Sequence, residues 1–205
     1  MDTRRRTLIA ALTLAAFAPV RSALSQPRPP FTEIKPPMAS EAEGKIDVAE
    51  FFWYGCIHCY NLEPVLEGWL KKVPPDVQFR RVPAVFNARW GHDAAIFYTF
   101  ESMGVLEKIH RPFFDAIHRD HLQTDSSTAL GEWLVKNGID TKKFNDTLKS
   151  FGVQSKVRKA TQLTVASKID GTPAILVQGR YQVGAGERML DNVNQAIDFA
   201  RTHKS

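Results

Sequence analysis

Cysteine is nearly absent from this sequence, which contains two, Cys56 and Cys59, among 205 residues. A structural zinc site needs four ligands, and the histidines of the chain show no spacing that would complete one with this pair. A purely structural disulfide is a poor explanation as well, because closing so short a loop stabilises a fold little. The spacing Cys-x-x-Cys therefore indicates redox chemistry of the two thiols, with a copper site formed by soft sulfur ligands as the metal alternative.

Long apolar runs are also scarce, and the one that stands out is Leu8–Val20 near the N-terminus. It follows the basic run Arg4–Arg6 and precedes small residues, which is the three-part pattern of a secretory signal peptide. The run is shorter than the roughly 20 residues that a membrane-spanning helix needs. We therefore expect residues 1–25 to be a signal peptide and the mature protein to lie outside the cytoplasm, where disulfides persist. The arginines also resemble a twin-arginine signal, so the export route stays open.

A strong excess of one charge is missing too. The formal net charge of +5 at first suggests an acidic partner. Removing residues 1–25 takes away four arginines and one aspartate, which leaves a net charge of +2. So small an excess gives little support for nucleic-acid binding, and we expect no nucleic-acid partner.

The chain begins and ends with strand and helix patterns that enclose a helical block. Residues 27–40 are proline-rich and predict an irregular arm with an edge strand. The other expected elements are a buried strand at 45–54, a helix at 60–73 kinked by Pro64, a strand at 77–86, a hairpin at 173–185 around Gln178-Gly179 and a helix at 189–203. Between these two groups, residues 90–168 carry helical spacing throughout and predict four or five helices without a strand. The order predicts one α/β domain interrupted by an all-helical insertion.

The two cysteines lie where a predicted strand runs into a predicted helix. Cys56 is then at the helix N-terminus, where free N–H groups and the helix dipole stabilise a thiolate, so we expect a lowered pKa. Cys59 lies one turn further into the helix and is expected to stay protonated. His58 lies between them, and as a donor or cation near the Cys56 sulfur it is expected to make the disulfide a stronger oxidant.

Two segments resemble a known family. EFFWYGCIHCYNLEPVLEGW, residues 50–69, resembles the strand–Cys-x-x-Cys–helix segment of the thioredoxin superfamily, and more closely that of the DsbA family of disulfide oxidoreductases. GTPAILVQGRYQVGAG, residues 171–186, resembles the second active-site segment of that family. The resemblance covers essentially the whole chain and implies a thioredoxin-like fold interrupted by an all-helical insertion domain. On this basis we divide the chain into a signal peptide (1–25), a first thioredoxin-like part (26–88), the insertion (89–168) and a second thioredoxin-like part (169–205).

The resemblance implies roles for the residues around the cysteines. Cys56 is expected to be the nucleophile of the mixed disulfides, Cys59 the resolving thiol, and His58 the residue that tunes Cys56. Pro173 matches the cis-proline that faces the cysteines in the family, which leaves the backbone of Thr172 free to pair with an extended peptide.

A buried acid is implied as well. Glu50 is the only charged residue near the end of its predicted strand, and matches the acid that the family buries beneath the cysteines, where it helps to move the Cys59 proton. Arg81 on the next strand is the expected cationic partner. The chain departs from the best-known family members at Ile57, where they have proline, and from many of them at Thr172, where they have valine. Both positions tune redox potential and substrate choice.

The resemblance also implies partners and a location. We expect an enzyme of the periplasm that donates its disulfide to reduced or unfolded exported proteins and is reoxidised by a membrane quinone reductase of the DsbB type. No cofactor is expected, and we expect a monomer. One alternative is a reductase or isomerase of the same fold, although isomerases usually carry a separate dimerisation domain, for which residues 27–51 leave no room. Another is a non-catalytic metal-binding or chaperone module.

Overall fold

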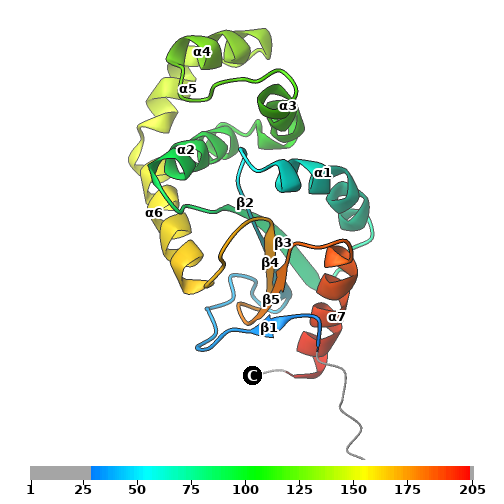
Figure 1. Ribbon diagram of the computed structural model, residues 1–205. Coiled ribbons are helices and arrows are strands. Elements are labelled where there is room, and N and C mark those ends of the chain that lie inside the picture. The colour runs from blue at the N-terminus through cyan, green and yellow to red at the C-terminus, as the bar shows by residue number, and fades with distance from the viewer. Residues whose placement is uncertain (1–28, 204–205) are drawn as a thin grey trace, which may run out of the picture.

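The computed structural model describes residues 29–203, and the expected signal peptide lies outside them. Five strands form one sheet in the order β1-β5-β4-β2-β3 (Figure 1). Their bounds are β1 Thr32–Glu33, β2 Ile46–Phe52, β3 Val77–Pro83, β4 Ala174–Val177 and β5 Tyr181–Gly184. The expected strands and the hairpin are therefore confirmed, and the proline-rich arm supplies the edge strand β1.

The central strand β2 carries the residue pattern of a strand covered on both faces. All seven of its residues are buried, and it pairs in parallel with β3 and antiparallel with β4. Val48 packs in one apolar cluster with α7 (Met189–Thr202), whereas Ala49 and Phe51 belong to a second cluster with the inserted helices. Side chains alternate between the faces of a strand, so Glu50 points to the same face as Val48.

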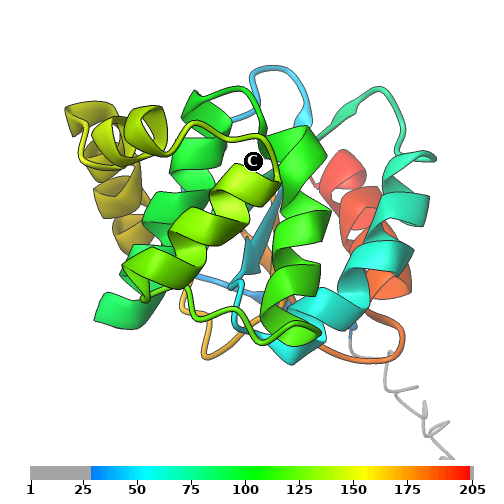
Figure 2. The same cartoon turned by 90° about the horizontal axis from the view of Figure 1, so that it is seen from above.

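Helix α1, Ile57–Leu70, follows β2 directly and begins at Cys56, its N-cap residue. It starts earlier than the helix expected from apolar spacing, because the Cys-x-x-Cys segment itself forms the first turn. Pro64 lies inside this helix, which continues past it to Leu70. Seen from above, α1 and α7 lie together on one side of the molecule (Figure 2). The two helices contribute Leu62, Trp69 and Val193 to the same apolar cluster.

Five helices separate β3 from β4, as the helical spacing predicts. They are α2 Ala88–Ser102, α3 Leu106–His118, α4 Ser127–Lys136, α5 Thr141–Leu148 and α6 Phe151–Ala166. Four of the five have a side-chain N-cap of the usual kind, which are Asn87, Ser126, Asp140 and Ser150. Between residues 88 and 166 the structure has no strand. No helix among the described residues combines the length and hydropathy required to cross a membrane.

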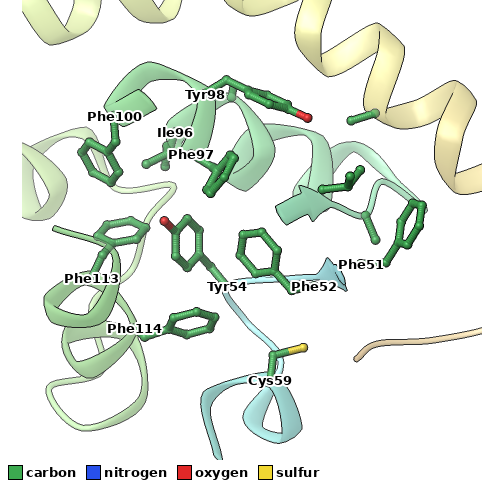
Figure 3. Close-up of a cluster of buried hydrophobic side chains, with 14 of the residues drawn as sticks. Phe51, Phe52, Tyr54, Cys59, Ile96, Phe97, Tyr98, Phe100, Phe113 and Phe114 are labelled. Atoms are coloured by element: carbon green, nitrogen blue, oxygen red, sulfur yellow. The ribbon is translucent and has the colours of Figure 1, made fainter. Parts of the chain in front are cut away.

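The insertion packs on the sheet through an aromatic core. Phe52 and Tyr54, at the end of β2 and just beyond it, contact Phe97 on α2 and Phe114 on α3 with tilted or edge-on rings. Figure 3 shows Cys59 at the border of this core, close to the chain that carries Tyr54. The insertion therefore packs directly on the segment that holds the two thiols.

Candidate active site

The two thiols lie at the first turn of α1 in unlike surroundings. Cys56 is half-buried, whereas Cys59 is fully buried. The backbone N–H of Cys59 donates to the Cys56 Sγ at 3.3 Å, so the sulfur itself caps the helix. This is the position at which helix N–H groups and the helix dipole favour an anion.

These surroundings separate the acidities of the two thiols. A hydrogen bond from the Cys59 thiol, the Thr172 side chain and the backbone N–H groups of Cys59 and His58 outweigh the effect of burial and lower the pKa of Cys56 to about 5. Burial, together with the hydrogen bond to Cys56, raises the pKa of Cys59 far above its ordinary value. Cys56 is thus a thiolate at neutral pH in the reduced protein, and Cys59 stays protonated, as the sequence predicts.

Thr172 and Pro173 come to the cysteines from the other end of the chain. The Thr172–Pro173 peptide bond is cis. The carbonyl oxygen of Thr172 lies 3.3 Å from the Cys56 Sγ, across 116 positions of sequence. The predicted pairing of the second segment with the Cys-x-x-Cys segment therefore matches the geometry of the fold.

His58 is placed differently from the expectation drawn from the sequence. Its side chain is exposed and lines a groove beside Pro173, while its backbone N–H is the group that helps to lower the pKa of Cys56. The groove has a volume of about 470 Å³ and is also lined by Leu62, Val65 and Leu190. A larger cavity of about 560 Å³ lies elsewhere, between the N-terminal arm and the end of α7.

Glu50 is fully buried on the face of the sheet that α1 covers. It is directly opposite Arg81 in the parallel register of β2 and β3, and its Oε2 lies 3.3 Å from Arg81 Nε. Burial raises the pKa of Glu50 to about 8, although the positive charge of Arg81 opposes this shift. The charge of Glu50 also contributes to the high pKa of Cys59, after burial and the interactions with Cys56. The cationic partner expected on the next strand is therefore Arg81.

A buried polar chain that we did not predict continues from Arg81. Glu63 on α1 accepts a hydrogen bond from Arg81 Nη2 at 3.0 Å, and its other oxygen lies 3.3 Å from His110 Nε2. His110 Nδ1 in turn lies 2.9 Å from the Tyr54 hydroxyl. Although burial opposes it, the contacts with His110 and Arg81 keep the pKa of Glu63 below its ordinary value, whereas burial lowers that of His110. One signal was available, because Glu63 follows Cys59 by four positions and so shares its helix face.

His118 contacts the segment that carries the two thiols. Its Nε2 lies 2.8 Å from the Tyr54 carbonyl oxygen, and its ring stacks on that of Tyr60 at 4.8 Å. The α3 helix ends at His118. His121 therefore does not share a helix with it. Among the described residues, no three His, Cys, Asp or Glu side chains are grouped as metal ligands.

A low-pKa thiol at a helix start, with a protonated partner one turn on and a cis-proline beside it, is the arrangement by which thioredoxin-like proteins exchange thiols and disulfides. The fold and the site thus define a thiol:disulfide oxidoreductase. The family described as "DSBA-like thioredoxin domain" matches residues 81–198.

Comparison with known proteins shows which family of thiol:disulfide oxidoreductases the chain resembles. The "Thiol:disulfide interchange protein DsbA" of Azotobacter vinelandii is 42% identical over 76% of this chain and 73% of its own length. The protein of the same description from Bordetella parapertussis is 42% identical over 85% of this chain and 83% of its own. A crystal structure of Pseudomonas aeruginosa DsbA has a TM-score of 0.79 at 35% identity and covers 84% of this chain and 93% of that one. The chain belongs to the DsbA family.

Proposed function

We propose that this oxidoreductase works as a disulfide donor, which passes its Cys56–Cys59 disulfide to exported proteins as they fold. The observation that carries the proposal is the unequal acidity of the two thiols. A thiolate with a pKa of about 5 is a good leaving group, so a mixed disulfide at Cys56 is resolved readily. The same acidity stabilises the reduced form, which makes the disulfide form an oxidant.

The transfer takes place in two steps. A substrate thiolate attacks Cys56 Sγ, the Cys56–Cys59 bond breaks, and Cys59 leaves as a thiolate that takes up a proton. A second substrate thiolate then attacks the substrate sulfur of the mixed disulfide and expels Cys56 as a thiolate. The substrate loses two electrons and gains a disulfide, while the enzyme is left reduced.

Glu50 is the proposed source of the proton for Cys59. With a pKa of about 8 it is mostly protonated at neutral pH, and its charge acts on Cys59, the thiol that needs a proton when the disulfide opens. Arg81 limits the rise of that pKa and keeps the carboxyl able to ionise and recharge. The proposed role of Glu50 rests on its burial and on the charge of Arg81, and it needs no contact between Glu50 and the substrate.

Thr172 and Pro173 are proposed to hold the substrate chain. The Thr172 carbonyl lies at the reactive sulfur, where an extended peptide that is joined to Cys56 would pass. The groove beside His58 and Pro173 has apolar side chains at Leu62 and Val65, which suit the apolar residues of unfolded proteins. The His58 side chain lines this groove. Its backbone N–H helps to lower the pKa of Cys56.

The remaining parts of the proposal concern the cell. Residues 1–25 direct the chain to the periplasm, and the division into thioredoxin-like parts at 26–88 and 169–205 around an insertion at 89–168 is retained. The enzyme acts as a monomer without a cofactor, and a membrane quinone reductase of the DsbB type reoxidises it. The small net charge of the mature chain supports a partner other than a nucleic acid.

The redox potential tests the direction of electron flow. The protein is equilibrated in glutathione buffers while the fluorescence of Trp53, three residues before Cys56, reports its redox state. A value near the roughly −120 mV typical of DsbA supports the donor. A value near the roughly −270 mV typical of thioredoxin contradicts it and favours a reductase. Cys56→Ser separates both from a chaperone, because thiol exchange stops in this variant while a chaperone activity persists.

A further inference from the structure

A buried carboxylate in the insertion binds the segment that precedes the two cysteines. Asp93 on α2 is 2% exposed, and its Oδ2 accepts a hydrogen bond from the indole Nε1 of Trp53 at 2.7 Å. Trp53 directly follows β2 and lies three residues before Cys56. Neither residue belongs to the site as described above, and the charge of Asp93 is not used in the proposed transfer.

The indole of Trp53 is fixed on two further sides. It stacks on Trp90 of α2 with the ring centroids 4.3 Å apart and an interplanar angle of 12°. It also lies over Gly55, because a Cβ atom added there would be 2.3 Å from the Trp53 ring. Gly55 is thus the residue type that leaves room for the Trp53 ring. The ring in turn covers the backbone next to Cys56.

The main chain of Trp53 contacts the redox turn itself. Its carbonyl oxygen accepts a hydrogen bond from the backbone N–H of Cys56 at 3.0 Å. The backbone of Trp53 also acts on the Cys59 thiol, whose pKa it lowers slightly against the larger effect of burial. One residue therefore joins a side chain anchored in the insertion to the backbone of the turn that carries both cysteines.

Asp93 is itself held firmly. The Thr124 hydroxyl donates to its Oδ1 at 2.5 Å, and Arg89 Nε lies 3.4 Å from its Oδ2. Arg89 also donates to Thr124 at 2.9 Å. These partners lie on α2 and in the segment before α4, so the anchor belongs wholly to the insertion.

We propose that Asp93 is a positioning residue for thiol–disulfide exchange, which acts through the Trp53 indole to hold the Cys-x-x-Cys turn in the geometry that stabilises the Cys56 thiolate. The effect falls on the reduced form, since the disulfide closes the turn covalently when the protein is oxidised. Loss of the anchor therefore destabilises the reduced form more and makes the enzyme a weaker oxidant. The proposal rests on the oxidoreductase activity and not on its direction.

The test compares four single variants and one double variant of the protein in glutathione buffers, with the redox state read by thiol alkylation and mass spectrometry. Trp53→Phe removes the indole N–H, and Asp93→Ala removes its acceptor. For both we expect the equilibrium constant for reduction by glutathione to fall about two- to tenfold, the range for one net hydrogen bond. We also expect the Cys56 pKa to rise in both. Asp93→Asn keeps an oxygen that accepts from the indole, and should lie between Asp93→Ala and the parent.

Thr124→Val is the matched control. It removes a hydrogen bond to the same carboxylate without touching Trp53, so it should lower the stability of both redox forms and leave the glutathione constant unchanged. Combining Trp53→Phe with Asp93→Ala should add no further shift beyond either change alone. If Asp93→Ala does not fold, Trp53→Phe still decides the matter, since Asp93 keeps its other two partners there.

An unchanged constant and an unchanged Cys56 pKa in Trp53→Phe would overturn the proposal and leave Asp93 with a structural role only. An equal shift in Thr124→Val would do the same, because it would trace the effect to general loosening. The equilibrium constant of the parent protein for reduction by glutathione tests the donor function. The ratio of each variant's constant to that of the parent tests the role of the Asp93–Trp53 hydrogen bond. The two ideas can therefore fail separately.

Discussion

The hydrogen bond from the Cys59 thiol and the helix start lower the pKa of Cys56 to about 5, whereas free thiols such as that of glutathione have a pKa of about 8.5. Between these values, reduction of the enzyme by glutathione releases one proton, because the product carries a thiolate. We therefore predict that the equilibrium constant for this reduction rises about tenfold per pH unit between pH 5 and 8. Thiol alkylation after equilibration at each pH measures it. A constant that does not change over this range would show that Cys56 keeps its proton.

The pKa of Glu50 is shifted in the opposite direction from that of Cys56, because burial raises it from 4.5 to about 8. A raised pKa means that the folded state holds a proton more tightly than the unfolded state, so stability is lost as pH rises between these values. Glu50→Gln removes this loss. We expect the variant to match the parent near pH 4 and to exceed it by about 4 kcal/mol at pH 8, because each pKa unit corresponds to about 1.4 kcal/mol, measured by urea unfolding of the disulfide form.

Glu63→Gln is the control for that experiment. The pKa of Glu63 is lowered by His110 and Arg81, so its contribution to stability is present above the unfolded pKa and lost in acid. The variant should therefore be less stable than the parent at pH 7, and the difference should shrink towards pH 4. If Glu50→Gln also destabilised the protein at pH 8, the charge pairing with Arg81 would outweigh the burial of Glu50.

Among the elements, the β4–β5 hairpin contacts the N-terminal arm closely at Gly179, whose carbonyl oxygen accepts a hydrogen bond from the backbone N–H of Met38 at 2.7 Å. Gly179 has a positive φ of 59°, and a Cβ atom added there would lie 2.3 Å from the Met38 carbonyl oxygen. We predict that Gly179→Ala destabilises the protein by about 1–3 kcal/mol. The added Cβ is strained at this positive φ, and it also clashes with the Met38 carbonyl. Gly184→Ala is the control, because its added Cβ meets nothing within 4 Å. Equal urea midpoints for the two variants would contradict the prediction.

The elements also show what the sequence can and cannot predict. The strands, the hairpin and the five-helix insertion follow from local periodicity, and the start of α1 follows from the thiol motif. The polar chain from Arg81 through Glu63 and His110 to Tyr54 does not, because each member is ordinary in its own element. It exists only because β3, α1, α3 and the segment after β2 meet at one point. The same holds for Asp93, which sequence patterns leave on a helix face.

At the scale of the whole molecule, the two redox forms should differ in stability in a way that depends on pH. A disulfide that closes so small a ring constrains the unfolded chain by about 2 kcal/mol. Against this, a Cys56 pKa lowered from 9.0 to about 5 favours the folded reduced form. A lowered pKa gives stability that is present at high pH and lost as pH falls through the folded value. At pH 8 it contributes about 4 kcal/mol, or roughly 3 after a discount for partial exposure.

We therefore predict that the reduced protein is the more stable form at pH 8, by about 1 kcal/mol or more, and that this order reverses as the pH falls towards 5. Urea unfolding of the two forms at both pH values measures the difference. The double variant Cys56→Ser with Cys59→Ser is the control, and its midpoint should not respond to oxidant. A disulfide form that stays the more stable at pH 8 would mean that the ring closure outweighs the thiolate. The Cys56–Cys59 disulfide would then be harder to reduce in the folded protein than in the unfolded chain, which contradicts the role of a disulfide donor.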